Sequence, residues 1–474
     1  MTCQCKTPFD TRANSVTESP DSMTAMYMKR FSLLIISFLL FLPSRAQAES
    51  APHYRLNLSD CIEMAVRNNE EIKAQEYDVQ AYIARKIEAT KRYVPVVTIK
   101  YRMAPVPRDL NNPAVSFLSG DISVFNSIKL EAGIPITTFG RIEVNKHLAE
   151  IGIDAAQLKT KQKTDEVILD IHKLYHGILL ARELKVLANK GLDAIHEKIA
   201  ELEKEENIDQ LQILKLKAVY YEVEKRLDEA HKKETIALAM LKVRTGIGDD
   251  VDFDIKDKAL TTDYLAIEAY ENLLQTSKAK RPEFQLLQHQ VNAKNLQVKL
   301  EKKAYFPMLK FGGYFEYGNS PHIIGDEDDN TFNNPFNYTR AAAGLELSNE
   351  LDFRKIQANV EKAKAEHLKA IAEKRSNDRL LEVDLKNAYL DFIQKQKFLS
   401  RAEKEQRAAR EIVFLTKSNL DIGLGEKKEY LDALQSYLVI QAAVLENIYN
   451  YNMAAATLKQ KLGTIGQEAR TKAL

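Results

Sequence analysis

Four short segments of the chain alternate strictly between apolar and polar residues. The first two cover residues 97–103 and 128–134, and the other two cover residues 309–317 and 340–347. A period of two places apolar side chains on one face of a strand and polar side chains on the other. The four segments therefore predict two β-hairpins, over residues 95–135 and 307–348.

The polar faces of the predicted strands carry charged side chains, which are Lys100, Arg102, Lys129, Glu131, Lys310, Glu316, Arg340 and Glu346. Each strand has about 8 to 11 residues, the length that a tilted strand needs to cross the hydrocarbon core. On alternation alone, a soluble four-stranded sheet capped by helices is an equal alternative. A water-filled lumen requires charged faces, so we expect a membrane barrel with these eight side chains inside.

Between and after the hairpins the apolar spacing changes to that of helices. No proline lies between residues 136 and 281, and none follows Pro335, so long helices are permitted there. Steps of four and three residues predict coiled-coil seams. The seams consist of Val167, Ile171, Leu174 and Ile178 in one region and of Leu381, Leu385, Ala388 and Phe392 in the other. A helix from residue 141 to about residue 207 is roughly 100 Å long, which predicts an elongated molecule.

The chain contains two copies of one pattern. Asn69-Glu70-Glu71-Ile72 and Tyr93-Val94-Pro95 match Arg281-Pro282-Glu283-Phe284 and Tyr305-Phe306-Pro307 at one constant offset. Each copy predicts a helix, a hairpin, a very long helix, a tip and a returning helix. We expect the first repeat over residues 49–250, the second over 251–466, and a tail over 467–474.

Residues 1–48 have the features of a signal peptide and leader. Lys29 and Arg30 precede an apolar stretch over residues 31–42, and Ala46-Gln47-Ala48 follows as a cleavage site. The sequence therefore predicts export. Beyond the leader only Cys61 remains, which excludes an intrachain disulfide and predicts a small core residue in the first helix.

Composition narrows the class of partner. The chain has 68 Lys and Arg residues against 67 Asp and Glu residues, so no global field indicates nucleic-acid binding. Hydrophobic residues make up 45% of the chain, which is enough to bury a core and argues against wholesale disorder.

No motif indicates an enzyme, a cofactor or a metal site. The chain has no glycine-rich phosphate loop and no G-x-S-x-G sequence. His172 and His176 lie four residues apart on a helix and could hold a metal, but no glutamate and third ligand follow as in H-E-x-x-H. The acidic run over residues 326–329 lacks the glycine and terminal glutamate of a calcium loop, so we expect a solvated loop tip.

Four strands cannot close a membrane barrel by themselves. The smallest such barrels have about eight strands, because an open edge in lipid leaves backbone groups unpaired at several kcal/mol each. Chains must therefore combine, and three copies provide about 12 strands.

Taken together, these features resemble the TolC family of trimeric outer-membrane factors. Residues 56–72, LNLSDCIEMAVRNNEEI, are similar to the family's N-terminal helix, with Glu70 where proline is typical, while Pro282 keeps the proline in the second repeat. The resemblance implies a mainly helical fold with β-strands, in which a 12-stranded trimeric barrel continues into an α-helical barrel in the periplasm. It also implies an outer-membrane location with a periplasmic extension.

The best local match covers a helical tip in the second repeat. Ile422-Gly423-Leu424-Gly425, followed by Glu429-Tyr430-Leu431-Asp432-Ala433, is similar to the family's second-repeat tip. The match implies an acidic ring of Glu429 and Asp432 at the periplasmic entrance, since residues three apart share a helical face. It also implies tip turns that dock an adaptor, at Gly423, Gly425, Asn207 and Ile208. Ordinary solvated charges remain the alternative for the two acids.

The resemblance implies a passive exit duct of a tripartite efflux or type I secretion system. Its partners would be two further copies of the chain, a periplasmic adaptor, an inner-membrane pump and the lipid bilayer. The alternative is a soluble periplasmic coiled-coil scaffold or adaptor, whose strands form a small domain.

Overall fold

The computed structural model describes residues 53–204, 210–248, 250–266, 268–324 and 334–467. The chain divides into two compact units, Met1–His53 with Asp250–Asp252, and Tyr54–Asp249 with Phe253–Leu474. The larger unit holds nearly all of the described elements. The predicted signal peptide, the acidic run over 326–329, and Asn207 and Ile208 lie outside the described residues.

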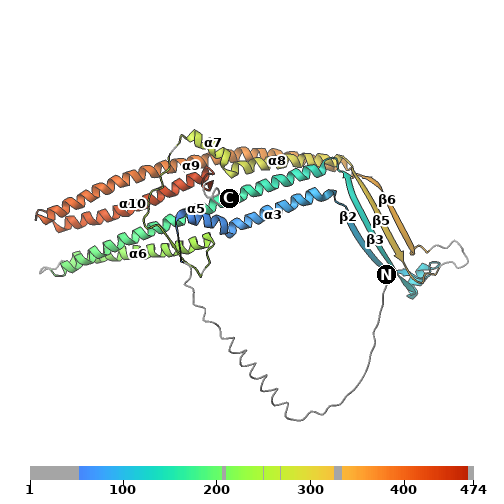
Figure 1. The fold of residues 1–474 in the computed structure, drawn as a ribbon, viewed down its shortest axis with the longest axis horizontal. Coiled ribbons are helices and arrows are strands. Elements are labelled where there is room, and N and C mark those ends of the chain that lie inside the picture. The colour runs from blue at the N-terminus through green and yellow to red at the C-terminus, as the bar shows by residue number, and fades with distance from the viewer. Residues whose placement is uncertain (1–52, 205–209, 249, 267, 325–333, 468–474) are drawn as a thin grey trace, which may run out of the picture. The chain divides into compact units, whose positions relative to one another are not determined.

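Helices make up most of the larger unit (Figure 1). Two of them are very long: α5 has 62 residues and α9 has 69, which correspond to about 90 and about 100 Å. The prediction of long helices is confirmed. The helices are α2 (Leu58–Asn68), α3 (Glu70–Thr90), α4 (Pro113–Ser119), α5 (Arg141–Leu202), α6 (Gln210–Thr245), α7 (Tyr270–Lys280), α8 (Pro282–Lys302), α9 (Phe353–Asp421) and α10 (Lys427–Lys461).

None of the helices in the described part of the chain is both long enough and apolar enough to cross a membrane.

The helices pack in antiparallel pairs that follow one another along the chain. Helix α5 packs against α3 and α6, α9 packs against α8 and α10, and α5 also contacts α8 and α10 (Figure 1). The predicted seams lie in these contacts, because Ile171, Ile178 and Phe392 are fully buried. Burial of apolar residues at heptad spacing is what holds such long helices together.

Asparagine and proline divide the N-terminal helix of each half. The Asn69 side chain accepts hydrogen bonds from the backbone N–H groups of Glu71 and Ile72, so a new helix, α3, begins directly after α2. In the second half, Pro282, which matches Glu70, is the first residue of α8, where its missing N–H has no partner to lose. The predicted single helix over residues 56–72 is therefore two helices.

Four antiparallel strands form a sheet in the order β2-β3-β5-β6 (Figure 1). Both predicted hairpins are confirmed: β2 pairs with β3, β5 pairs with β6, and β3 joins β5, with an irregularity between Pro135 and Thr137. The strands are β2 (Val96–Pro107), β3 (Ile122–Thr137), β5 (Met308–Asn319) and β6 (Tyr338–Ser348). A second, two-stranded sheet pairs β1 (His53–Leu56) with β4 (Asp252–Ile255).

The buried residues form two clusters, one in each half of the larger unit. The first includes Cys61, which is fully buried on α2 as predicted, and Tyr175. The second surrounds Phe392 and Tyr451, whose rings lie 5.3 Å apart. Each returning helix is thus anchored beside a long helix by its own apolar core.

Corresponding ion pairs accompany the two clusters. Arg244, near the end of α6, lies 2.9 Å from Asp170 on α5. Lys461, at the end of α10, lies 3.0 Å from Asp384 on α9. In both halves a cation at the end of a returning helix faces an aspartate in the middle of a long helix. The C-terminus of the returning helix also favours the positive charge of this cation.

Candidate functional site

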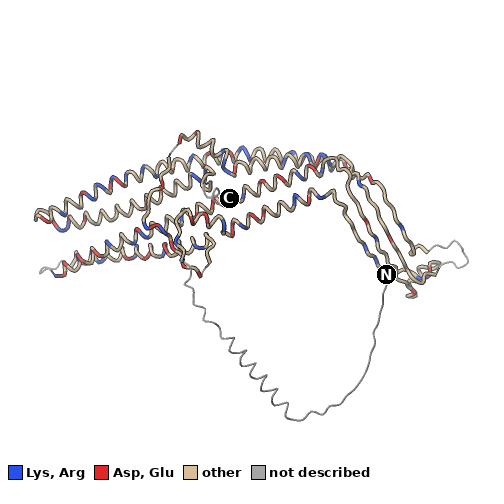
Figure 2. The backbone as a smooth tube through the Cα atoms, in the orientation of Figure 1, with Lys and Arg blue, Asp and Glu red and all other residues tan. Residues whose placement is uncertain are grey.

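The eight residues predicted to carry charge into a lumen lie on one face of the four-stranded sheet. Lys100 pairs in register with Lys129, Lys129 with Glu316, and Glu316 with Arg340, so one charged row crosses all four strands. Residues two apart on a strand share a face, which adds Arg102 and Glu131, and Lys310 pairs with Glu346 on the same face. Figure 2 shows charged positions along the strands.

Ion pairs connect this charged row. Lys100 and Lys129 each lie 2.7 Å from Glu131. Arg102 lies 3.6 Å from Glu316, whose carboxylate also accepts a hydrogen bond of 3.0 Å from the Tyr338 hydroxyl. Because positive and negative side chains are mixed along this row, the face of the sheet is strongly polar but carries no large net charge of one sign.

The opposite face of the sheet is apolar and exposed in the single chain. Ile99, Met103 and Leu345 keep 67%, 69% and 67% of their surface exposed. The same face contains further exposed apolar residues, which are Val97, Tyr101, Ile128, Leu130, Phe311, Phe315, Tyr317 and Leu347. A continuous exposed apolar face of this kind is typical of a surface that contacts lipid or another protein.

Both edges of the sheet are open among the described residues. In the described part of the chain, strands β2 and β6 each pair with one neighbour only. Each open edge is 11 or 12 residues long and presents unpaired backbone groups. A single chain therefore leaves this sheet incomplete.

The tip between α9 and α10 is a tight turn built on glycine. Gly423 has a φ of 77°, a conformation that glycine adopts without steric cost. The backbone N–H groups of Leu424 and Gly425 both donate to the Asn419 carbonyl, at 2.9 and 3.0 Å. A Cβ atom on Gly425 would lie only 3.0 Å from the Cβ of Asn419, so the predicted turn needs both glycines.

Glu429 and Asp432 lie just after this turn, on the first turns of α10, and both are exposed. Neither carboxylate forms an ion pair among the residues that the structure describes. The N-terminus of α10 favours the negative charge of Glu429. The two carboxylates are therefore free to act on solutes or on another chain.

The structure brings together one cluster that sequence reasoning missed. His172 and His176 on α5 lie close to Asp263, in the segment that follows β4. The sequence predicts no metal site here, because no third ligand lies near His172 and His176 along the chain. No spacing signal connects Asp263 to the two histidines, because their proximity depends on how this segment packs on α5.

Comparison with known proteins gives a family match over part of the chain and a shared fold. Residues 273–464 match the family described as "Outer membrane efflux protein". No match was found among curated proteins.

Several solved outer-membrane proteins share the fold, and CmeC and MtrE among them are described as outer-membrane channels. CmeC of Campylobacter jejuni has 16% identity and a TM-score of 0.69, over 88% of this chain and 89% of that chain. MtrE of Neisseria gonorrhoeae, in its open state, has 18% identity and a TM-score of 0.69, over 89% and 94%. VceC of Vibrio cholerae has 14% identity and a TM-score of 0.64, over 86% and 96%. The predicted resemblance in fold is confirmed.

Proposed function

We propose that this TolC-like outer-membrane efflux protein is the exit channel of a tripartite efflux or type I secretion system and works as a homotrimer. One observation carries the proposal: a four-stranded sheet with a charged face, an exposed apolar face and two open edges. The family match and the shared fold support the efflux role.

The sheet supports a barrel shared between chains. An apolar outer face suits lipid, and a charged inner face suits a water-filled lumen. Pairing β6 of one chain with β2 of the next removes every open edge, and three chains provide about 12 strands, above the minimum of about eight. The eight charged residues from Lys100 to Glu346 then line the lumen.

The long helices extend the same tube into the periplasm. Helices α5 and α9 each follow a strand directly and are about 90 to 100 Å long. The corresponding pairs Arg244–Asp170 and Lys461–Asp384 support two internal repeats, over residues 49–250 and 251–466. Six such helices and their returning partners would form the α-helical barrel, with residues 467–474 as a tail.

The tips form the periplasmic entrance in this proposal. Three copies of Glu429 and Asp432 would place six carboxylates around the mouth and favour cations, as carboxylate rings do in cation channels. The turns at Gly423, Gly425, Asn207 and Ile208 would dock a periplasmic adaptor. Transport is passive, and an inner-membrane pump supplies the energy.

The acidic ring has a direct test in single-channel recordings. Replacing both Glu429 and Asp432 by Ala should remove most of the cation preference and the block by multivalent cations. Glu411→Ala is the control, because Glu411 is also an exposed acid but lies on α9 before the tip. Unchanged selectivity and block in the double variant would make the two acids ordinary solvated charges.

The soluble scaffold is the alternative function, and extraction of the protein decides between the two. The channel should stay with the outer membrane until detergent is added and then have three times the mass of one chain. A monomer released by osmotic shock without detergent would overturn the channel and favour the scaffold.

A further inference from the structure

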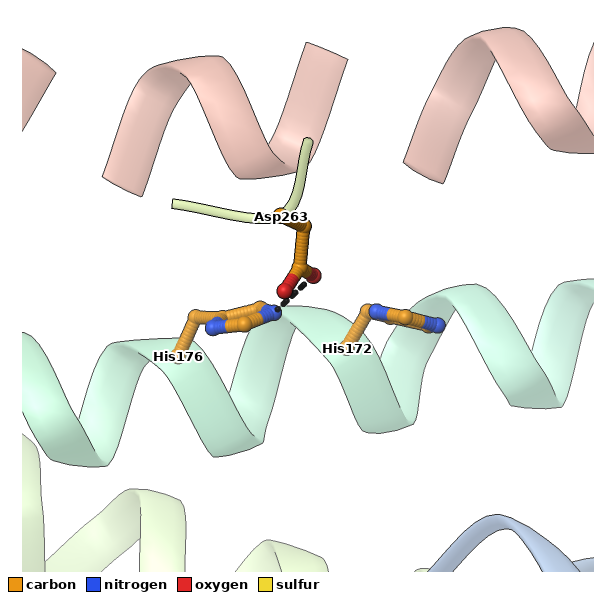
Figure 3. A group of neighbouring side chains, drawn as sticks. All are labelled: His172, His176 and Asp263. Atoms are coloured by element: carbon orange, nitrogen blue, oxygen red, sulfur yellow. Dashed lines mark ion pairs between the residues drawn. The ribbon is translucent and has the colours of Figure 1, made fainter. Parts of the chain in front are cut away.

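Three side chains with metal-binding atoms converge beside the middle of α5. His172 and His176 lie on one face of the helix, and Asp263 approaches them from the segment over residues 256–266 (Figure 3). One nitrogen of each histidine and one carboxylate oxygen all lie within 4.8 Å of one another. Bonds of about 2.0 to 2.2 Å to a common zinc ion place ligand atoms about 3.5 Å apart, so only small side-chain movements are needed.

The histidines lack the hydrogen bonds that buried imidazoles normally make. His176 is only 4% exposed. The Nδ1 atoms of His172 and His176 are buried without a hydrogen-bond partner in the described part of the protein. His176 Nε2 lies 3.2 Å from an Asp263 oxygen, at ion-pair distance but without the alignment of a hydrogen bond. Unsatisfied buried nitrogen atoms cost free energy unless a ligand completes them.

A buried asparagine holds Asp263 in place. Asn452 on α10 is 1% exposed, and its side-chain oxygen accepts a hydrogen bond of 2.9 Å from the Asp263 backbone N–H. Its side-chain nitrogen donates to the Thr261 carbonyl at 2.7 Å. Supporting contacts of this kind orient the residues that bind a metal. The Asp263 side chain is 39% exposed, which provides a path from solvent.

The local charges suit a cation. The Asp263 carboxylate supplies the one acidic ligand atom of the three, beside two imidazole nitrogens. Lys459 on α10 is the opposing positive charge near the cluster.

We propose that His172, His176 and Asp263 bind one divalent transition-metal ion of the zinc class, with a fourth position left to water. Two imidazoles and one carboxylate suit zinc and its neighbours rather than calcium or magnesium, which prefer oxygen ligands. The ion would cross-link α5 to the segment that leads from the first half of the chain to the second. A metal clamp at this point goes beyond a role as a passive duct.

Cobalt(II) is the probe, because its visible absorption reports a site with nitrogen and oxygen ligands. The full chain is purified in detergent without a polyhistidine tag, stripped with a chelator and titrated. We expect one Co²⁺ per chain, displaced by one Zn²⁺, and a higher thermal midpoint with Zn²⁺ bound. His176→Ala and Asp263→Asn should each weaken binding by at least about 10-fold, the lower end of the effect of losing a supporting contact.

His147→Ala is the matched control, because His147 is an exposed histidine on the same helix and lies 3.0 Å from Glu150. It should bind Co²⁺ as the unchanged protein does. Asp263→Asn preserves the size of the side chain and keeps the test valid if His176→Ala fails to fold. Absence of the cobalt band in the unchanged protein at millimolar Co²⁺, or equal affinity in Asp263→Asn, would overturn the proposal.

Discussion

Gly463 lies directly against the backbone of Arg281. A Cβ atom at position 463 would come within 2.8 Å of the Arg281 backbone nitrogen. Gly463 also has a φ of 71°, in the left-handed region. Gly246 approaches Asn68 in the same way, where a Cβ atom would lie 2.7 Å from the Asn68 Cβ. In each half, a glycine just after the returning helix therefore contacts the junction between two N-terminal helices, α2 and α3 in the first half and α7 and α8 in the second.

This contact predicts the effect of a single methyl group. Gly463→Ala should destabilise the fold by about 1 to 3 kcal/mol, because it adds both a steric overlap and a left-handed alanine. Thermal unfolding followed by circular dichroism measures the change as a lower midpoint. Gly248→Ala is the control, since no atom of the described residues beyond its chain neighbours lies within 4 Å of the added Cβ atom. Equal midpoints for the two variants would mean that the contact is not as close as described.

A hydrogen bond between Tyr175 and Asp257 predicts a second stability effect. The Tyr175 hydroxyl donates to the Asp257 carboxylate at 2.6 Å, and the ring is 1% exposed. Tyr175→Phe should cost about 1 kcal/mol, since the exposed carboxylate can take up water when it loses its partner. Tyr264→Phe, at a tyrosine that is 87% exposed, should change the thermal midpoint little. A Tyr175→Phe midpoint equal to that of Tyr264→Phe would contradict this account.

The ion pairs of Glu71 predict a pH dependence. The Arg244 guanidinium, which donates a hydrogen bond to Glu71, and Lys163 at 3.3 Å hold the pKa of this carboxyl below its ordinary value of 4.5. A carboxyl with a lower pKa in the folded state stabilises the fold above its unfolded pKa, and the stabilisation is lost as the pH falls. Glu71→Gln should therefore lower the thermal midpoint at pH 7, and the difference should shrink below about pH 4.5.

The neighbouring residue provides the control for this pH series. Glu70 is 84% exposed, and its one ion pair among the described residues is with Lys73, three residues away on the same helix. Glu70→Gln should alter the thermal midpoint little at any pH, since exposed pairs contribute at most about 1 kcal/mol. A difference between the unchanged protein and Glu71→Gln that stays constant from pH 7 to pH 3 would rule out the proposed linkage.

The two faces of the sheet predict opposite responses to a lysine. Ile99→Lys places a charge on the apolar face, where it should cost about 2 to 4 kcal/mol near the middle of a bilayer. Thr98→Lys places the same charge on the face of Glu131, its register partner, and should be tolerated. The yield of oligomer in the outer-membrane fraction measures the effect of each substitution. Equal yields would argue against lipid on the apolar face.

Period-two and heptad patterns in the sequence predicted the four long strands and the seams of the long helices. The strands around Ile99 and Phe311 follow from period-two alternation, and the seams at Ile171 and Phe392 follow from heptad spacing. Helix α4 and the strands β1 and β4 were not predicted, because they have only four to seven residues and show no period. Pro113 at the start of α4 and Gly120 at its end are the signals that could have indicated it.

Contacts between distant segments could not be predicted in this way. The approach of Asp263 to His176 depends on Asn452, in a helix near the end of the chain. The row from Lys100 to Arg340 was predicted strand by strand, but its continuity depends on the register between β3 and β5, which joins the two hairpins. A single sequence contains no local signal for either arrangement.

Conductance across a planar lipid bilayer shows whether the protein forms a channel. The protein is extracted from outer membranes in mild detergent and added to one side. We expect discrete, lasting conductance steps from an oligomer of three chains, with a preference for cations. A protein that carries no current, although its oligomer is intact in the bilayer, would contradict the proposal that these strands enclose a channel.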